Sequence, residues 1–248
     1  WSICAATGGS AVPSPNLPFA EPLLHALFWS AITIAFYLLA KRLYRRWPRT
    51  WLMPLAVAPV LVGGVVLGLH ASYRDYISGT HWLVLLLGPA TVAFAVPIYE
   101  QRALIRRQWP VLLAGMLAGT AASVLSSWGL ATLFGLDGTL RLSLLPRSIT
   151  TPFAMEVSSD IGGSPDLTAI FVVITGIVGA VVGDVLLARV RFRSALARGA
   201  LFGVAAHGAG TARAHQIGES EGAIAGLAMV LVGLLNVLAA PLLALLLR

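Results

Sequence analysis

Long apolar runs, separated by short clusters of charged residues, make up most of this chain. When the runs are cut at the charges, they give seven segments near the roughly 20 residues that a helix needs to cross a bilayer. The predicted spans are 22–40, 51–70, 81–99, 110–135, 165–188, 197–217 and 221–247. The pattern therefore predicts an all-α polytopic membrane protein with about seven transmembrane helices.

Helix-breaking residues interrupt three apolar stretches, at 86–99, 144–157 and 203–215. At bilayer depth, a freed backbone group is costly unless protein or a water-lined cavity satisfies it. The residues expected to break the helices are Gly88, Pro89, Pro97, Pro146 and Pro152, and Gly208 and Gly210 in the last stretch are expected to take part in substrate binding. We therefore expect the functional site where these interrupted stretches meet.

The composition indicates lipid as the solvent of this chain. Apolar residues make up 58% of it, charged residues make up 11%, and the mean hydropathy is +0.85. Soluble domains carry about 25% charged residues. In a soluble chain a net charge of +7 would suggest a nucleic-acid partner, but here the arginines lie in loops and set orientation. We therefore expect the lipid bilayer, and no nucleic acid, as a partner.

Residues 1–20 are expected to be a disordered lead ahead of a membrane domain at 21–248. A single cysteine, Cys4, excludes an intramolecular disulfide and a cysteine-based metal site. The sequence contains no Ser-His-Asp spacing, HExxH motif, P-loop or Cys/His metal pattern. We therefore expect a protein that is not an enzyme and that uses no metal or cofactor.

Loop charges predict the topology. Lysine and arginine concentrate at 41–49, 102–107 and 189–198, and the positive-inside rule places all three clusters in the cytoplasm. This requires 139–163 to enter and leave from the outer side as a re-entrant segment. The N-terminus is then expected outside and the C-terminus in the cytoplasm.

In this topology the broken spans 81–99 and 197–217 cross in opposite directions. Each is predicted to be the middle helix of a three-helix unit, with the two units at 51–135 and 165–248. Inverted repeats whose interrupted helices cross near the midplane are an architecture of secondary transporters.

The motif HGAGTARAH at 207–215 places His207, Thr211 and Arg213 in one apolar span. The glycines permit an unwound turn whose exposed N–H groups attract an anion, and Arg213 could hold a carboxylate with two hydrogen bonds. His207 is also a candidate proton relay. The alternative is that Arg213 snorkels at the outer interface while the glycines serve helix packing.

The motif LPRSITTPFAME at 145–156 holds Arg147, Ser148, Thr150 and Thr151 between two prolines, which preclude a regular helix there. A guanidinium and three hydroxyls would suit a hydroxy acid. The alternative is an outer loop that dips into the headgroups. Thr91, the one hydroxyl of LGPATVAFAVP at 87–97, is expected to complete the site, and the alternative there is an ordinary Pro-kinked helix.

These stretches also carry a family resemblance. The strings LLGPATVAFAVPIYEQ, SLLPRSITTPFAMEVSSDIGG and AAHGAGTARAHQIGESEGAIAGLAM resemble the LrgB/CidB family of bacterial inner-membrane proteins, in order, over residues 22–248. The resemblance implies a protein of the cytoplasmic membrane that works with a small LrgA/CidA-like, holin-like partner. Asp184 departs from the family pattern, because an uncharged residue is expected at that position.

Members of this family are described as antiholin-like regulators of murein hydrolase activity, and the similar plant protein is a plastid glycolate/glycerate translocator. Our leading hypothesis is a transporter or exporter of small monocarboxylates of the glycolate, glycerate, lactate or pyruvate type. The alternative is a regulator of murein hydrolase export and cell lysis that acts with the LrgA/CidA-like partner. Both hypotheses are compatible with a homo-oligomer.

Overall fold

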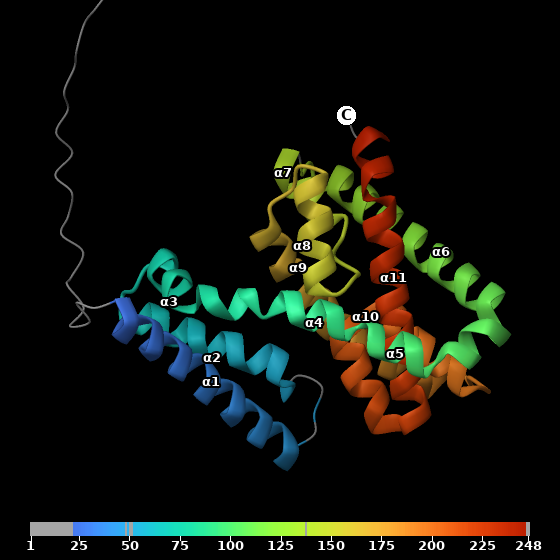
Figure 1. Cartoon of the computed structure of the whole chain (residues 1–248), viewed down its shortest axis with the longest axis horizontal. Helices are drawn as coiled ribbons and strands as arrows, with labels where there is room; N and C mark the ends of the chain where they lie inside the picture. The colour runs from blue at the N-terminus through green and yellow to red at the C-terminus, as the bar shows by residue number, and fades with distance from the viewer. Residues whose placement is uncertain (1–21, 48, 50–51, 137, 247–248) are drawn as a thin grey trace, which may run out of the picture.

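The computed structural model describes residues 22–47, 49, 52–136 and 138–246 (Figure 1). Within these residues the secondary structure is entirely helical. The helices are α1 Pro22–Arg46, α2 Pro54–Gly68, α3 Tyr73–Leu85, α4 Leu87–Ala93, α5 Ala95–Glu100, α6 Arg102–Leu133, α7 Gly138–Leu144, α8 Thr151–Asp160, α9 Pro165–Arg189, α10 Ala195–Ile217 and α11 Glu219–Leu246. The expected lead at 1–20 and the C-terminal Arg248 lie outside the described residues.

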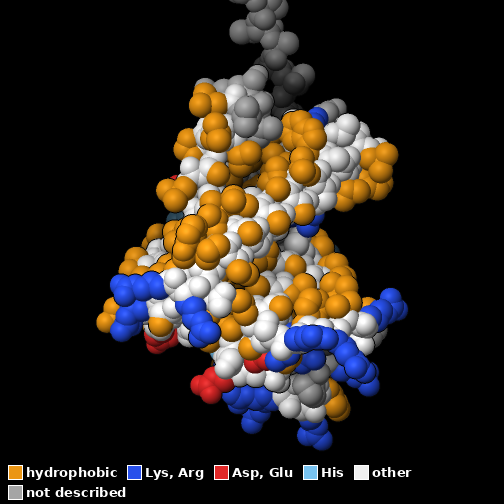
Figure 2. Space-filling model, turned by 90° about the vertical axis from the view of Figure 1, so that its right-hand side faces the viewer, with side chains coloured by type: hydrophobic (Ala, Val, Ile, Leu, Met, Phe, Trp, Pro, Cys, Tyr) orange, Lys and Arg blue, Asp and Glu red, His pale blue; other side chains and the backbone are white. Residues whose placement is uncertain are grey.

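Five helical stretches of the described chain are long and apolar enough to cross a membrane, judged by length and composition. They are Leu24–Arg46, Tyr73–Glu100, Arg102–Leu133, Pro165–Arg189 and Glu219–Leu245, and α2 is a shorter apolar helix. Hydrophobic side chains cover much of the exterior in Figure 2, a surface that lipid solvates and water does not. The predicted fold class, an all-α polytopic membrane protein, is confirmed.

Helices α3, α4 and α5 form one long run with two kinks (Figure 1). The kink residues Leu86 and Phe94 keep right-handed helical dihedrals, with φ of −71° and −64°. α3 ends four residues before Pro89 and α4 ends four residues before Pro97, which is where a proline removes a hydrogen bond and crowds the carbonyl. The interruption predicted at 86–99 is therefore present as a Pro-kinked helix, without an unwound turn.

Helices α7 and α8 form a hairpin, residues 138–163, that enters and leaves at the same end of α9. The Ser164 N–H donates to Ser143 Oγ at 2.7 Å, so the end of α7, from which 145–150 lead to the tip, lies beside the segment that follows the returning arm α8. The Thr168 hydroxyl of α9 lies 2.9 Å from the Ser143 carbonyl oxygen and 2.7 Å from Ser158 Oγ. This first hairpin has the form predicted for the re-entrant segment 139–163.

α10 also doubles back, contrary to the prediction that 197–217 crosses the membrane. A straight helix would separate residues 198 and 217 by about 28 Å, and four further residues span at most about 14 Å. Arg198 Nη2 nevertheless lies 2.6 Å from Glu221 Oε1. The reversal occurs at His207, whose φ of 38° and ψ of −121° are not helical.

Contacts with α11 confirm that the two halves of α10 run in opposite directions. In the first half, Gly199 and then Gly203 lie against Glu221 and then Ala225. In the second half the order is reversed, because Thr211 contacts Met229 whereas His215 contacts Gly222. Residues 195–217 therefore form a second hairpin, and the two stretches predicted as matching broken helices differ in form. The predicted repeat units 51–135 and 165–248 stay a prediction.

The basic clusters gather at one end of the molecule, as loop charge predicts. Lys and Arg side chains concentrate at the lower end of the view in Figure 2. Gln216 Nε2 donates to the Tyr44 hydroxyl at 2.7 Å and so joins the end of α10 to the end of α1. Ser194 and Leu112 line one recess, which brings the start of α6 to the same end. We call this end the basic side.

The second hairpin changes the order of crossings. α11 begins on the basic side beside Arg198 and runs away from it, whereas the predicted last span ends there. The segment with Glu219 and Glu221, predicted to lie on the outer side, is instead on the basic side. Which side is cytoplasmic stays a prediction.

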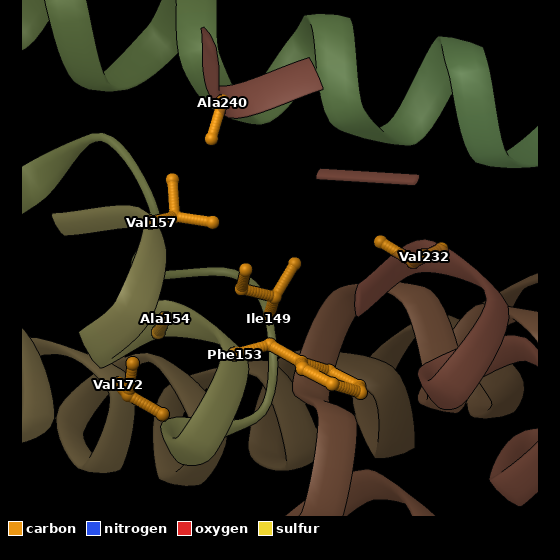
Figure 3. Packing of buried hydrophobic residues seen from close by; sticks show 7 residues of the cluster. All are labelled: Ile149, Phe153, Ala154, Val157, Val172, Val232 and Ala240. Carbon is orange, nitrogen blue, oxygen red and sulfur yellow. The ribbon is translucent and has the colours of Figure 1, made fainter. Parts of the chain in front are cut away.

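A hydrophobic core fixes the first hairpin between α9 and α11. Figure 3 shows the cluster, which consists of Ile149, Phe153, Ala154, Val157, Val172, Val232 and Ala240. The Phe153 ring lies against Gly233 of α11, where a side chain would leave no room for it. Phe94, at the second kink of the α3–α5 run, packs on the other side of Phe153 with ring centroids 5.6 Å apart. The core therefore holds the hairpin by its returning arm, α8.

Candidate functional site

The tips of the two hairpins meet halfway along α9. Ile149 and Phe153 of the first hairpin pack with Val172 of α9. The His207 ring at the tip of the second hairpin lies against Gly176, one turn further along α9. Because the hairpins enter from opposite ends of α9, their tips converge near the middle of the structure.

One cavity of about 970 Å³ lies beside both tips. Thr150 and Thr151 line it from the first hairpin, and His207 and Gly208 line it from the second. These four residues belong to two of the motifs that the sequence singled out. The structure therefore brings part of the predicted site together.

Two helices begin at this cavity. The first backbone hydrogen bond of α8 runs from the Ala154 N–H to the Thr150 carbonyl. The N–H groups of Thr151 and Phe153, which precede Ala154, therefore have no acceptor within the helix. The second half of α10 starts after His207, and Gly208 and Ala209 at its start also line the cavity. Helix N-termini carry partial positive charge, which stabilises an anion.

His207 has a strained backbone and a buried side chain with an unpartnered nitrogen among the described residues. Its φ of 38° lies in a region that favours glycine, and such strain costs about 1–3 kcal/mol. The side chain is 3% exposed, and its Nε2 atom has no hydrogen-bond partner among the described residues. A Cβ on Gly176 would lie 2.6 Å from His207 Cε1, so α9 has a glycine where the ring needs room. Strain of this kind concentrates at binding sites and switch regions.

The wall opposite the tips comes from α1 and α2, and no motif pointed to it. α2 contributes apolar residues, including Pro54, Ala58 and Val62. α1 contributes three residues that carry a hydroxyl group, Thr33, Tyr37 and Tyr44. These positions are four and seven residues apart, so they share one face of a helix. That spacing in the sequence indicates a polar helix face that could line a cavity.

Arg213 lies outside the residues that line the cavity. Its Nε donates to Asp184 Oδ1 at 2.7 Å, and its Nη1 donates to Gln216 Oε1 at 2.8 Å. Gln216 in turn reaches Tyr44, so a chain of polar contacts joins α9, the second hairpin and α1 on the basic side. The position of Arg213 relative to the outer interface, and the alternative that it snorkels there, stay predictions. Asp184, the departure from the family pattern, is the partner of Arg213.

Arg147 also points away from the cavity, toward α6. Its Nε donates to Ser127 Oγ at 2.8 Å, its Nη2 to Ser126 Oγ at 3.3 Å, and its Nη1 to Thr175 Oγ1 at 3.4 Å. The neighbouring Ser148 is half-buried and is not among the residues lining the cavity.

The remaining predicted residues make their contacts within their own helices. The Thr211 hydroxyl donates to the His207 carbonyl at 2.9 Å, and the Thr91 hydroxyl donates to the Leu87 carbonyl at 2.6 Å. Gly210 packs tightly against the Phe202 carbonyl of the first arm, which closes the hairpin. Thr91 is not among the residues lining the cavity, so the structure does not bring the first motif to the tips. Roles of all these residues in substrate binding stay predictions.

The described residues hold no group of three His, Cys, Asp or Glu side chains that could bind a metal ion. With two helix N-termini, two threonine hydroxyls and a histidine, the cavity can accommodate a small anion by hydrogen bonding.

Comparisons with known proteins agree with the resemblance. The model of the LrgB-like family matches residues 33–246. The uncharacterized protein YwbG of Bacillus subtilis (strain 168) is 37% identical over 210 residues, which cover 85% of this chain and 93% of the relative. The holin-like protein CidB of Staphylococcus aureus (strain N315) is 32% identical over 223 residues, covering 90% of this chain and 97% of the relative. No solved structure matches the chain.

Proposed function

Because the chain belongs to the LrgB-like family, we propose that it is a membrane transporter of small monocarboxylates of the glycolate, glycerate, lactate or pyruvate type. The observation that carries the proposal is the meeting of two oppositely inserted hairpins at one cavity, with a helix N-terminus from each. Helix N-termini that converge near the midplane are a means by which transporters bind anionic substrates.

The substrate carboxylate would occupy the polar end of the cavity, between the two tips. There it would accept hydrogen bonds from the N–H groups at the start of α8 and after His207. The hydroxyls of Thr150 and Thr151 would contact the second oxygen function of a hydroxy or keto acid. The buried His207 ring, which packs against Gly176 of α9, would hold this tip in place beside the bound acid.

Alternating access would follow from movement of one hairpin relative to the other. The first hairpin separates the cavity from one side and is tied to α9 through Ser143, Ser158 and Thr168. The second hairpin separates it from the basic side and is tied to α9 and α1 through Arg213 and Gln216. Release of either set of contacts would open the cavity to one side only.

A second candidate function is holin-like regulation of murein hydrolase export and lysis, in concert with an LrgA/CidA-like membrane partner. The name of the staphylococcal relatives favours it. Such a role needs assembly with the partner and no saturable flux of an organic acid. The bacterial cytoplasmic membrane is the proposed location for both functions.

Uptake of labelled lactate, pyruvate, glycolate and glycerate by the purified full chain in proteoliposomes tests the transporter. We expect saturable uptake of at least one acid and a loss of about tenfold or more in Thr150→Val, because the buried tip loses its hydroxyl. Thr132→Val is the matched control, because its hydroxyl bonds within α6 and away from the cavity. Absence of uptake for all four acids by the folded chain would overturn the proposal.

The regulator is tested in the same vesicles after co-reconstitution with an LrgA-like protein. Release of an entrapped dye that requires both proteins, without acid uptake by either, would favour the second candidate. Acid uptake that does not depend on the partner would exclude the partner as an obligate subunit.

A further inference from the structure

Two arginines of the first hairpin contact neighbouring residues of α6, outside the cavity. Arg147 donates to the hydroxyls of Ser126 and Ser127 of α6. The Arg141 guanidinium lies over the Trp128 ring, with Cζ 3.3 Å from the ring centroid. The two cations therefore contact three consecutive residues of α6, although they come from different parts of the first hairpin.

Neither cation is balanced by a protein anion in the described part of the chain. The ion pairs found there join Arg198 to Glu221 and Arg213 to Asp184. The partners of Arg147 are neutral hydroxyls, and Arg141 lies against an aromatic ring. A partly buried cation without a counter-ion is costly in a membrane protein, and such cations generally face a partner or a polar ligand.

Donors without acceptors lie beside the two guanidinium groups. Arg141 Nε is buried and has no hydrogen-bond partner within the described residues, and the same is true of the Ser123 hydroxyl one turn before Ser126 and Ser127. Buried polar atoms are normally satisfied, so unpartnered ones call for an explanation. Two cations without an anionic partner among the described residues, beside spare N–H and O–H donors, are complementary to an oxyanion.

The position of the cluster indicates where the oxyanion would come from. It lies at the end of α6 away from the basic side, beside α7 at the entrance of the first hairpin. Trp128 is partly exposed there, and tryptophan favours the membrane–water interface. A lipid phosphate and a solute anion from the aqueous side can both reach such a depth.

We propose that Arg141 and Arg147, with the hydroxyls of Ser123 and Ser127, form an oxyanion-binding site at the membrane interface opposite the basic side. Its ligand is a phosphate or carboxylate group, carried by an anionic phospholipid or by a free solute. The site is separate from the cavity, because Thr150 and Thr151 of the first hairpin line the cavity whereas Arg147 faces α6. It does not depend on the transport function.

Thermal unfolding of the purified full chain in neutral detergent tests the site. We expect added phosphatidylglycerol, inorganic phosphate or lactate to raise the Tm by about 5 °C or more at saturation. Phosphatidylcholine, whose phosphate is balanced by choline, is the lipid control. A shift with phosphatidylglycerol alone identifies a lipid phosphate, and a shift with phosphate or lactate identifies a free oxyanion.

Arg141→Gln and Arg147→Gln should each remove most of that shift. Arg141→Gln is the safer variant, because among the described residues its guanidinium contacts the Trp128 ring and its Nε has no hydrogen-bond partner to lose. Arg74→Gln is the matched control, since Arg74 is exposed at the start of α3. No shift with any anion, or a shift that persists unchanged in Arg141→Gln, would overturn the proposal.

Discussion

Arg198 Nη2 of α10 lies 2.6 Å from Glu221 Oε1 of α11. If α10 were a straight helix, its length would place these two residues near opposite faces of a bilayer. The pair fixes both ends of the second hairpin on the basic side. It also makes the tip at His207 the deepest part of the hairpin. The geometry of the candidate site depends on this reversal.

Cysteine labelling should therefore detect Arg193 and Ser220 on the same side of the membrane. In a Cys4→Ser background, we expect Arg193→Cys and Ser220→Cys to react with a membrane-impermeant maleimide from one side only, and from the same side. Both positions are exposed, and they flank the hairpin. Phe134→Cys, exposed at the far end of α6, is the control that should react from the opposite side. Labelling of Arg193→Cys and Ser220→Cys from opposite sides would restore the predicted crossing at 197–217.

Gly176→Ala should disturb the candidate site, because the added methyl group would displace the His207 ring. The added Cβ would lie 2.6 Å from His207 Cε1, so the ring or the tip must move, and overpacking of this kind costs about 1–3 kcal/mol. We expect a lower Tm and a loss of acid uptake. Gly64→Ala is the matched control, because nothing lies within 4 Å of its added Cβ. Equal behaviour of the two variants in both measurements would show that the packing at Gly176 has no role in the site.

The hydrophobic pattern and the loop charges were sufficient to predict much of the fold. Apolar runs predicted the membrane-spanning class, and contacts of residues in or near the basic clusters 41–49, 102–107 and 189–198 place these clusters at one end. Pro146 and Pro152 correctly predicted a break in the helix, which lies between α7 and α8, whereas the re-entry of this segment into the membrane stays a prediction. At 86–99, however, the proline pattern alone did not distinguish a kinked helix from an unwound turn.

The second hairpin was not predictable by length, since 197–217 has the length of a span and no proline. Its reversal depends on one residue, His207, with a φ that histidine rarely adopts, and on tertiary contacts such as Arg198 with Glu221. The sequence therefore predicted only part of the candidate site. Motif analysis identified both tips, but it assigned Arg147 and Arg213 to a cavity that neither residue lines.

Phe153→Ala should destabilise the first hairpin strongly. Phe153 packs against Phe94 and Gly233 and belongs to the core shown in Figure 3, and a large-to-small change of this kind costs about 3–5 kcal/mol. We expect a clear fall in Tm in detergent. Val96→Ala is the control, because that side chain is exposed on the kinked helix. A fall in Tm no larger than that of the control would contradict the role of this core in holding the hairpin.

Arg213→Gln should open the basic side of the cavity. Arg213 ties the second hairpin to Asp184 of α9, and through Gln216 it is linked to Tyr44 of α1. Without this link, we expect a cysteine at Ala212, which lines the cavity, to react several-fold faster with a maleimide added on the basic side. Arg191→Gln, which removes an exposed arginine near the same end, should leave that rate unchanged.

Acid uptake separates this role of Arg213 from direct binding of the carboxylate. As a contact that closes the hairpin, Arg213 acts on the conformational step, so the variant should change the maximal rate more than the KM. A residue that clamps the carboxylate would instead raise the KM, because binding of the anion loses a charge-assisted hydrogen bond. A rise in KM of tenfold or more with an unchanged labelling rate would therefore return Arg213 to the binding site predicted from the sequence.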